Sequence, residues 1–145
     1  MDLIRRFLRR TWAERLILLE AFAWLCWARL LLLTVPFRWI APHLGRQMAE
    51  GPATLADSDR LVVGRVSWAV LAVSRRAELG FVCLPQAMAA KWMLRRRKLT
   101  STLYLGLRTN EKASLSAHAW LRVGDRILTG QAEACGHQVI ATFGD

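Results

Sequence analysis

The spacing of apolar residues changes once along the chain, from a helical period to a strand period, near residue 100. Before this point apolar residues recur at helical spacing, for example at Val62, Val66, Val70 and Val73. After it, residues 102–108 (TLYLGLR) alternate leucine with polar or small residues, as a half-buried strand does. Helices first and strands afterwards predict an α+β fold with N-terminal helices followed by an antiparallel sheet.

Capping and turn residues set the limits of the predicted elements. Thr11 and Glu14 have the spacing of a capping box, and Gly124-Asp125 indicates a two-residue hairpin turn. Helices are predicted over residues 12–33, 37–44, 58–76 and 84–97, and strands over residues 102–108, 117–123, 126–131 and 138–143. A polar, linker-like stretch opens at residues 51–52. We therefore expect an N-terminal helical region over residues 1–50 that packs on a core over residues 58–145, one compact domain in all.

Charge and hydrophobicity are both high for a chain of 145 residues. The net charge is +10, from 21 Lys and Arg against 11 Asp and Glu, and 54% of the residues are hydrophobic. Such a balance favours an acidic partner or a membrane surface. The three cysteines are an odd number, unlike a disulfide framework, and no His/Cys cluster has zinc-ligand spacing. We expect no metal site and a cytoplasmic protein.

An apolar stretch, residues 16–35, follows the Arg-rich start of the chain. It is long enough to span a membrane, but Glu20 and Arg29 lie within it, and each costs about 2.5–3.5 kcal/mol near the centre of a span. The stretch is also too long for a signal peptide and lacks a small-residue cleavage site after it. We expect a packed amphipathic helix, and a peripheral membrane contact stays open.

Cys83 directly precedes the predicted helix over residues 84–97. Pro85 suits the first turn of this helix, where its missing N–H is not needed. The dipole and the free N–H groups at a helix start stabilise a thiolate and lower the pKa of the thiol. His118 follows in a predicted strand, so the pair has the layout of a thiol nucleophile and its base. The backbone N–H of Cys83 is the expected oxyanion donor.

A catalytic imidazole usually has an acceptor that orients it. With a turn at residues 124–125, His118 pairs with Gln131, whose side-chain carbonyl we expect to orient the ring. Glu133 is the second candidate, for a strand that bulges or ends there. Asp125 is excluded, because seven strand residues place it about 23 Å from His118. A one-residue slip in register would turn Gln131 to the other face.

Several segments together resemble a known family. The lasso peptide biosynthesis B2 family is the stand-alone protease half of the split B protein, a transglutaminase-like cysteine peptidase. The likeness covers nearly the whole chain, including the Leu-rich helix, its VPFR end and the residues around Trp68. Its most specific segments are residues 83–87 (CLPQA), 94–97 (LRRR), 101–106 (STLYLG), 118–120 (HAW) and 126–130 (RILTG).

The resemblance implies a papain/transglutaminase-like catalytic core and a leader peptidase that cleaves the leader from a lasso-peptide precursor. Cys83 matches the nucleophile of the family and His118 its base. Many members carry an aspartate about a dozen residues after the histidine, where this chain has Gly130. The implied partners are the precursor leader, a separate leader-recognition protein and the macrolactam synthetase. The synthetase uses the ATP, and this chain is expected to need no cofactor.

Two other functions remain open on the residues alone. The same Cys–His site is compatible with acyl transfer to an amine in place of hydrolysis. The basic residues are compatible with a non-catalytic adaptor that binds nucleic acid or membrane. Residues 95–98 (RRRK) are more simply explained as a solvated helix end, so no nucleic acid is expected. Cys26, in the apolar helix, is expected to be an inert core residue, and Cys135 to lie in a loop.

Overall fold

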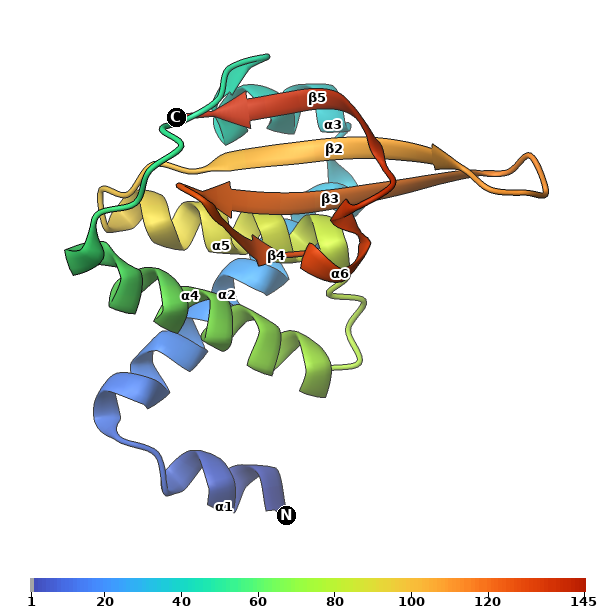
Figure 1. Ribbon diagram of the computed structural model, residues 1–145. Helices are drawn as coiled ribbons and strands as arrows, with labels where there is room; N and C mark the ends of the chain where they lie inside the picture. The colour runs from blue at the N-terminus through green and yellow to red at the C-terminus, as the bar shows by residue number, and fades with distance from the viewer. Residues whose placement is uncertain (1) are drawn as a thin grey trace.

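Helices cover one face of a five-stranded antiparallel sheet in the computed structural model, which describes residues 2–145 apart from the side chain of Glu133 (Figure 1). The α+β class is as predicted. The helices are α1 (Asp2–Leu8), α2 (Trp12–Thr34), α3 (Phe37–Ile40), the 3₁₀ helix η1 (Ala41–Leu44), α4 (Asp57–Arg76), α5 (Cys83–Arg96) and α6 (Gln131–Ala134). The strands are β1 (Arg46–Gln47), β2 (Thr102–Thr109), β3 (Leu115–Val123), β4 (Arg126–Thr129) and β5 (Gln138–Gly144).

Most predicted elements are confirmed with boundaries shifted by one or two residues. The capping box of α2 is present, with Glu14 N donating to Thr11 Oγ1 at 3.3 Å and Thr11 N donating to Glu14 Oε2 at 3.0 Å. The third predicted strand is shorter than expected, because β4 ends at Thr129 and α6 begins at Gln131. The short elements α1, β1 and α6 were not predicted.

The sheet has the strand order β1-β5-β2-β3-β4. Val123 pairs with Arg126, which confirms the two-residue turn between β3 and β4. Arg122 then faces Ile127, but Leu121 faces Thr129, so Leu128 is an extra residue on β4. This bulge changes the register of the hairpin before it reaches the middle of β3.

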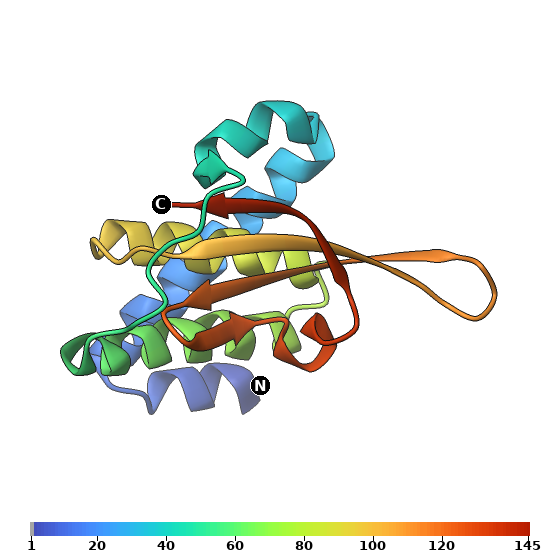
Figure 2. The ribbon, with the colours of Figure 1, turned by 45° about the horizontal axis from the view of Figure 1, so that its top comes forward.

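The helices form two layers behind the sheet. Helix α5 contacts β2, β3 and β4, and α2 packs on both α4 and α5 (Figure 2). Because α5 lies between the sheet and α2, residues 87–94 are all buried, and this segment is apolar except for Lys91. The core therefore surrounds the helix that begins at Cys83.

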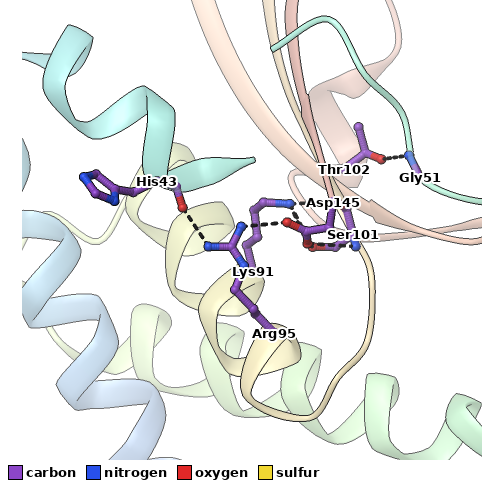
Figure 3. Close-up of polar contacts among 7 residues, drawn as sticks. All are labelled: His43, Gly51, Lys91, Arg95, Ser101, Thr102 and Asp145. Atoms are coloured by element: carbon purple, nitrogen blue, oxygen red, sulfur yellow. Dashed lines mark hydrogen bonds and ion pairs between the residues drawn. The ribbon is translucent and has the colours of Figure 1, made fainter. Parts of the chain in front are cut away.

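Ion pairs connect α5 to Asp145, the residue after β5, and to helix α2. The fully buried Lys91 Nζ donates to Ser101 O at 2.7 Å and to Asp145 Oδ2 at 3.0 Å (Figure 3). Arg95 binds the other oxygen of Asp145 at 2.6 Å, and this ties the segment after β5 to the helix. Arg97 binds Glu20 on α2 at 2.7 Å. The basic run at the end of α5 is thus not only the solvated helix end that the sequence suggested.

Candidate active site

Cys83 is the first residue of α5 and lies half-buried against the hydrophobic core. The N-cap residue Val82 offers no side-chain hydrogen bond, Pro85 has no N–H, and Gln86 N already donates to Val82 O at 3.1 Å. The N–H groups of Cys83 and Leu84 therefore have no acceptor inside the helix. Cys83 therefore lies at the positive end of the helix, where such N–H groups suit both a thiolate and an oxyanion.

His118 lies on β3 with its ring largely buried. Its Nε2 is 2.9 Å from the carbonyl oxygen of Gly130. A carbonyl only accepts, so Nε2 carries the hydrogen and donates it. In the neutral ring the basic lone pair then belongs to Nδ1. The contact with Gly130 thus orients the imidazole and places the hydrogen on Nε2.

Gly130 can make this contact because it has no side chain. Its φ is 73°, in the left-handed region that favours glycine. A Cβ atom at this position would lie 2.7 Å from His118 Nε2 and 2.6 Å from Ala119 O. The bulge at Leu128 and the end of β4 at Thr129 place Gly130 beside the ring. In this chain a main-chain carbonyl therefore holds Nε2 of the ring.

The predicted role of Gln131 rested on a pairing that the structure does not contain. Gln131 is exposed and begins α6, and it does not face His118 across the hairpin, because the bulge at Leu128 changes the register. The backbone of Glu133 lies in α6, but its side chain is outside the described part of the chain, so its role stays a prediction. Asp125 lies at the hairpin turn, 3.8 Å from Arg60.

Aromatic side chains of the same sheet pack beside the ring of His118. Trp120 stacks on His118 with ring centroids 5.9 Å apart, and Tyr104 stacks on Trp120 at 5.4 Å. Arg122 Nε donates to the Tyr104 hydroxyl at 2.8 Å and anchors the end of this column. The ring of His137 lies 5.3 Å from that of His118. These neighbours restrict rotation of the imidazole and shield it from water.

His137 and Tyr104 were not identified from the sequence as part of the site. Gly106 on β2 pairs with His118, and a glycine at this position of a strand indicates that other side chains come close. A Cβ on Gly106 would lie 2.8 Å from the Trp120 ring and 2.9 Å from His137 Cβ. A glycine inside a strand pattern often marks such a close approach. Gly106 was therefore the residue in the sequence that could have indicated the close packing around His118.

Helices α5 and α6 both pack on β3, the strand that carries His118. The N-terminal end of α5, which carries Cys83, lies at the same end of the sheet as α6 (Figure 1). A thiol at a helix start and a buried, oriented imidazole are the parts of a nucleophile and base. Cys26 is a poor alternative because burial raises the pKa of its thiol. Within residues 2–145, apart from the Glu133 side chain, no three His, Cys, Asp or Glu residues form a group that could hold a metal ion.

Comparison with known proteins gives one match. The model of the transglutaminase-like superfamily matches residues 31–142, from the second half of α2 into β5. This superfamily generally consists of cysteine-dependent enzymes. No curated protein and no solved structure matches the chain at a significant level. The matched range contains both Cys83 and His118.

Proposed function

The chain belongs to the transglutaminase-like superfamily, and from this premise we propose that it is a cysteine peptidase that removes the leader from a lasso-peptide precursor. The segments that resemble the B2 family, among them residues 83–87, 101–106 and 118–120, lie at the start of α5 and on β2 and β3. The observation that supports the proposal is the hydrogen bond from His118 Nε2 to Gly130 O, because it holds a buried imidazole in a fixed orientation on the strand that packs against α5.

In the first half of the reaction Cys83 becomes acylated. Cys83 Sγ gives its proton to His118 Nδ1 and attacks the carbonyl carbon of the last leader residue. The N–H groups of Cys83 and Leu84 stabilise the negative charge that forms on the carbonyl oxygen. The C–N bond then breaks, and Nδ1 returns the proton to the leaving amine. The leader remains on Sγ as a thioester, and the core peptide leaves with a free N-terminus.

In the second half water releases the leader. The water gives a proton to His118 Nδ1 as its oxygen attacks the thioester carbon. The C–S bond breaks, Sγ takes back a proton, and the leader departs with a free carboxyl group. The amine freed on the core peptide is the group that a separate, ATP-using macrolactam synthetase needs for ring closure. A separate leader-recognition protein would present the precursor to the peptidase.

Leader release by purified variants tests this proposal. With the precursor peptide and the leader-recognition protein present, Cys83→Ala and His118→Ala should each lower the rate of cleavage by more than about 10³-fold. Cys135→Ala is the matched control, since Cys135 is a free, exposed cysteine outside the proposed site. Circular dichroism should show that all three variants are folded. Cleavage by Cys83→Ala at the wild-type rate would disprove the thiol mechanism.

The products separate this function from its two rivals. Mass spectrometry should find the leader with a free carboxyl group. A leader joined to an added amine would instead mean acyl transfer on the same Cys–His site. A protein that releases no core peptide under any of these conditions, but binds nucleic acid in a manner that falls steeply with salt, would be an adaptor.

A further inference from the structure

The outward face of α2 is apolar along its whole length. Between Trp12 and Leu33, all of which the structure describes, every exposed side chain is apolar. We call these residues the α2 stripe: Trp12, Ala13, Leu16, Leu19, Phe22, Ala23, Trp27, Leu30 and Leu33. Their spacing of three and four residues keeps them on one side of the helix, over a length of about 30 Å. Monomeric soluble proteins rarely expose a continuous apolar surface of this size.

The apolar surface continues beyond α2 at both ends. Leu3, Ile4 and Leu8 are exposed on α1, and Trp39 is exposed on α3. A groove of about 540 Å³ lies between α1, α2 and α4, and its lining is mostly apolar, with four arginines: Arg6, Arg9, Arg10 and Arg76. Exposed apolar side chains are thus present on α1 and α3 as well as on α2.

Basic residues border this face. Arg5 and Arg6 on α1 and Arg9 and Arg10 directly after it are exposed at one end of the α2 stripe, and Arg38 is exposed at the other end. Helices that lie in a membrane surface combine an apolar face with arginines at headgroup depth. Tryptophan also favours the boundary between acyl chains and headgroups, and Trp12 and Trp39 lie near the two ends of the stripe. The charge complements an anionic lipid surface.

The contacts of α2 argue against a membrane span. Among the described residues α2 is the one helix that could cross a membrane, by length and composition alone. However, Ala21, Leu25 and Ala28 are buried in the core, and Glu20 binds Arg97 of α5 at 2.7 Å. Lipid on all sides of α2 would remove these contacts and leave Glu20 in hydrocarbon. One side of the helix belongs to the protein, so only the other side is available to lipid.

We propose that the chain docks on an anionic membrane through α1 and α2, with α2 lying in the plane of the surface. The α2 stripe enters the acyl boundary, and the arginines within residues 5–10 bind lipid phosphates. A lipid surface is the occupant that this face favours, because every exposed side chain of the stripe is apolar and exposed arginines lie beyond both of its ends. Their charge complements anionic headgroups.

Vesicle flotation with the full chain tests the docking. The wild-type protein should float with phosphatidylcholine vesicles that contain phosphatidylglycerol and bind pure phosphatidylcholine at least tenfold more weakly. The variant Leu16→Gln/Leu19→Gln/Leu30→Gln should lose at least tenfold in affinity. Its matched control is Met48→Gln/Leu79→Gln/Leu115→Gln, which changes three equally exposed apolar residues outside the stripe. Because all six side chains are exposed, both variants should keep the wild-type circular dichroism spectrum and melting temperature.

A second pair of variants tests the charge. Arg5→Gln/Arg9→Gln should weaken binding to the mixed vesicles roughly tenfold or more. Arg108→Gln/Lys112→Gln removes the same charge at the far end of the β2–β3 hairpin and should bind like the wild type. Equal losses for both pairs would show that only net charge matters, and this result would overturn the assignment of α1.

Three further outcomes would overturn the proposal. Absence of vesicle binding together with a dimer that the stripe variant dissociates would assign the face to a second copy of the chain. Absence of both vesicle binding and a dimer would leave a protein partner as the occupant. Retention in membranes after an alkaline carbonate wash would mean that α2 spans the bilayer. A blue shift of tryptophan fluorescence on vesicle addition, quenched by brominated lipids, is expected for the wild type and does not depend on any variant.

Discussion

Gly130 has two roles that depend on the absence of a side chain: it accepts the His118 hydrogen bond and adopts a left-handed conformation. Gly130→Ala should lower the rate of leader cleavage by tenfold or more, because the new Cβ would lie 2.7 Å from His118 Nε2. It should also lower the free energy of unfolding by more than the roughly 1–2 kcal/mol of left-handed strain alone. Urea denaturation and single-turnover cleavage measure the two effects.

Gly136→Ala is the control that separates strain from the clash. Gly136 also has a positive φ, 92°, but the nearest atom to its Cβ position is 3.6 Å away, on Arg108. This variant should therefore show about 1–2 kcal/mol of destabilisation with cleavage close to wild type. Equal cleavage rates for the two variants would mean that the Gly130 carbonyl does not position His118.

Among the elements, long helices were predictable and the end of the β3–β4 hairpin was not. The period of Val62, Val66, Val70 and Val73 is a local property, so it marks α4 without knowledge of the fold. Pro85 and the residues after it likewise mark the start of α5 beside Cys83. The bulge at Leu128 depends on how β4 meets β3, and no local pattern encodes it. One extra residue was enough to replace the predicted Gln131 side chain with the Gly130 carbonyl.

The contact between α5 and the segment after β5 makes stability depend on pH. Burial alone would raise the pKa of Asp145, but hydrogen bonds from Arg95 and Lys91 outweigh it and hold that pKa below its ordinary value. A carboxyl with a lowered folded-state pKa contributes stability above its unfolded pKa, and this is lost as the pH falls through the folded value. The contribution of Asp145 should thus be complete at neutral pH and disappear in acid.

Asp145→Asn should destabilise the protein by on the order of 3 kcal/mol at neutral pH, because it leaves the charge of the buried Lys91 without its carboxylate. Urea denaturation from pH 7 downwards measures the difference, which should shrink as Asp145 of the wild type becomes protonated. Asp125→Asn, at an exposed carboxylate 3.8 Å from Arg60, is the control and should change little. A difference that stays constant with pH would show that packing, not charge, explains the loss.

In the whole molecule the sheet with His118 and the α2 stripe lie on opposite sides of the layer formed by α4 and α5, and Cys83 begins α5 within that layer. The sheet that carries His118 is on one side of this layer, and α2 is on the other (Figure 2). Docking through α2 would therefore turn the sheet towards water and leave room for a peptide and its partner proteins. In this arrangement the apolar surface of α2 serves association, and His118 on the sheet faces away from the lipid.

Alkylation on vesicles tests this orientation. The α2 stripe approaches the start of α5, where the rings of Phe22 and Phe81 meet edge-on with centroids 6.3 Å apart, so Cys83 reports on how closely the lipid approaches the site. Iodoacetamide should modify Cys83 at the same rate in free protein and in protein bound to phosphatidylglycerol-containing vesicles, because the sheet that carries His118 would face water. Cys135, which is exposed, reports on access of the reagent in the same sample, and Cys26 should react slowly because burial raises its pKa. Peptide mass spectrometry measures all three rates. Protection of Cys83 by vesicles, with Cys135 unaffected, would mean that the lipid surface covers the site. Membrane binding would then inhibit the peptidase and not merely localise it.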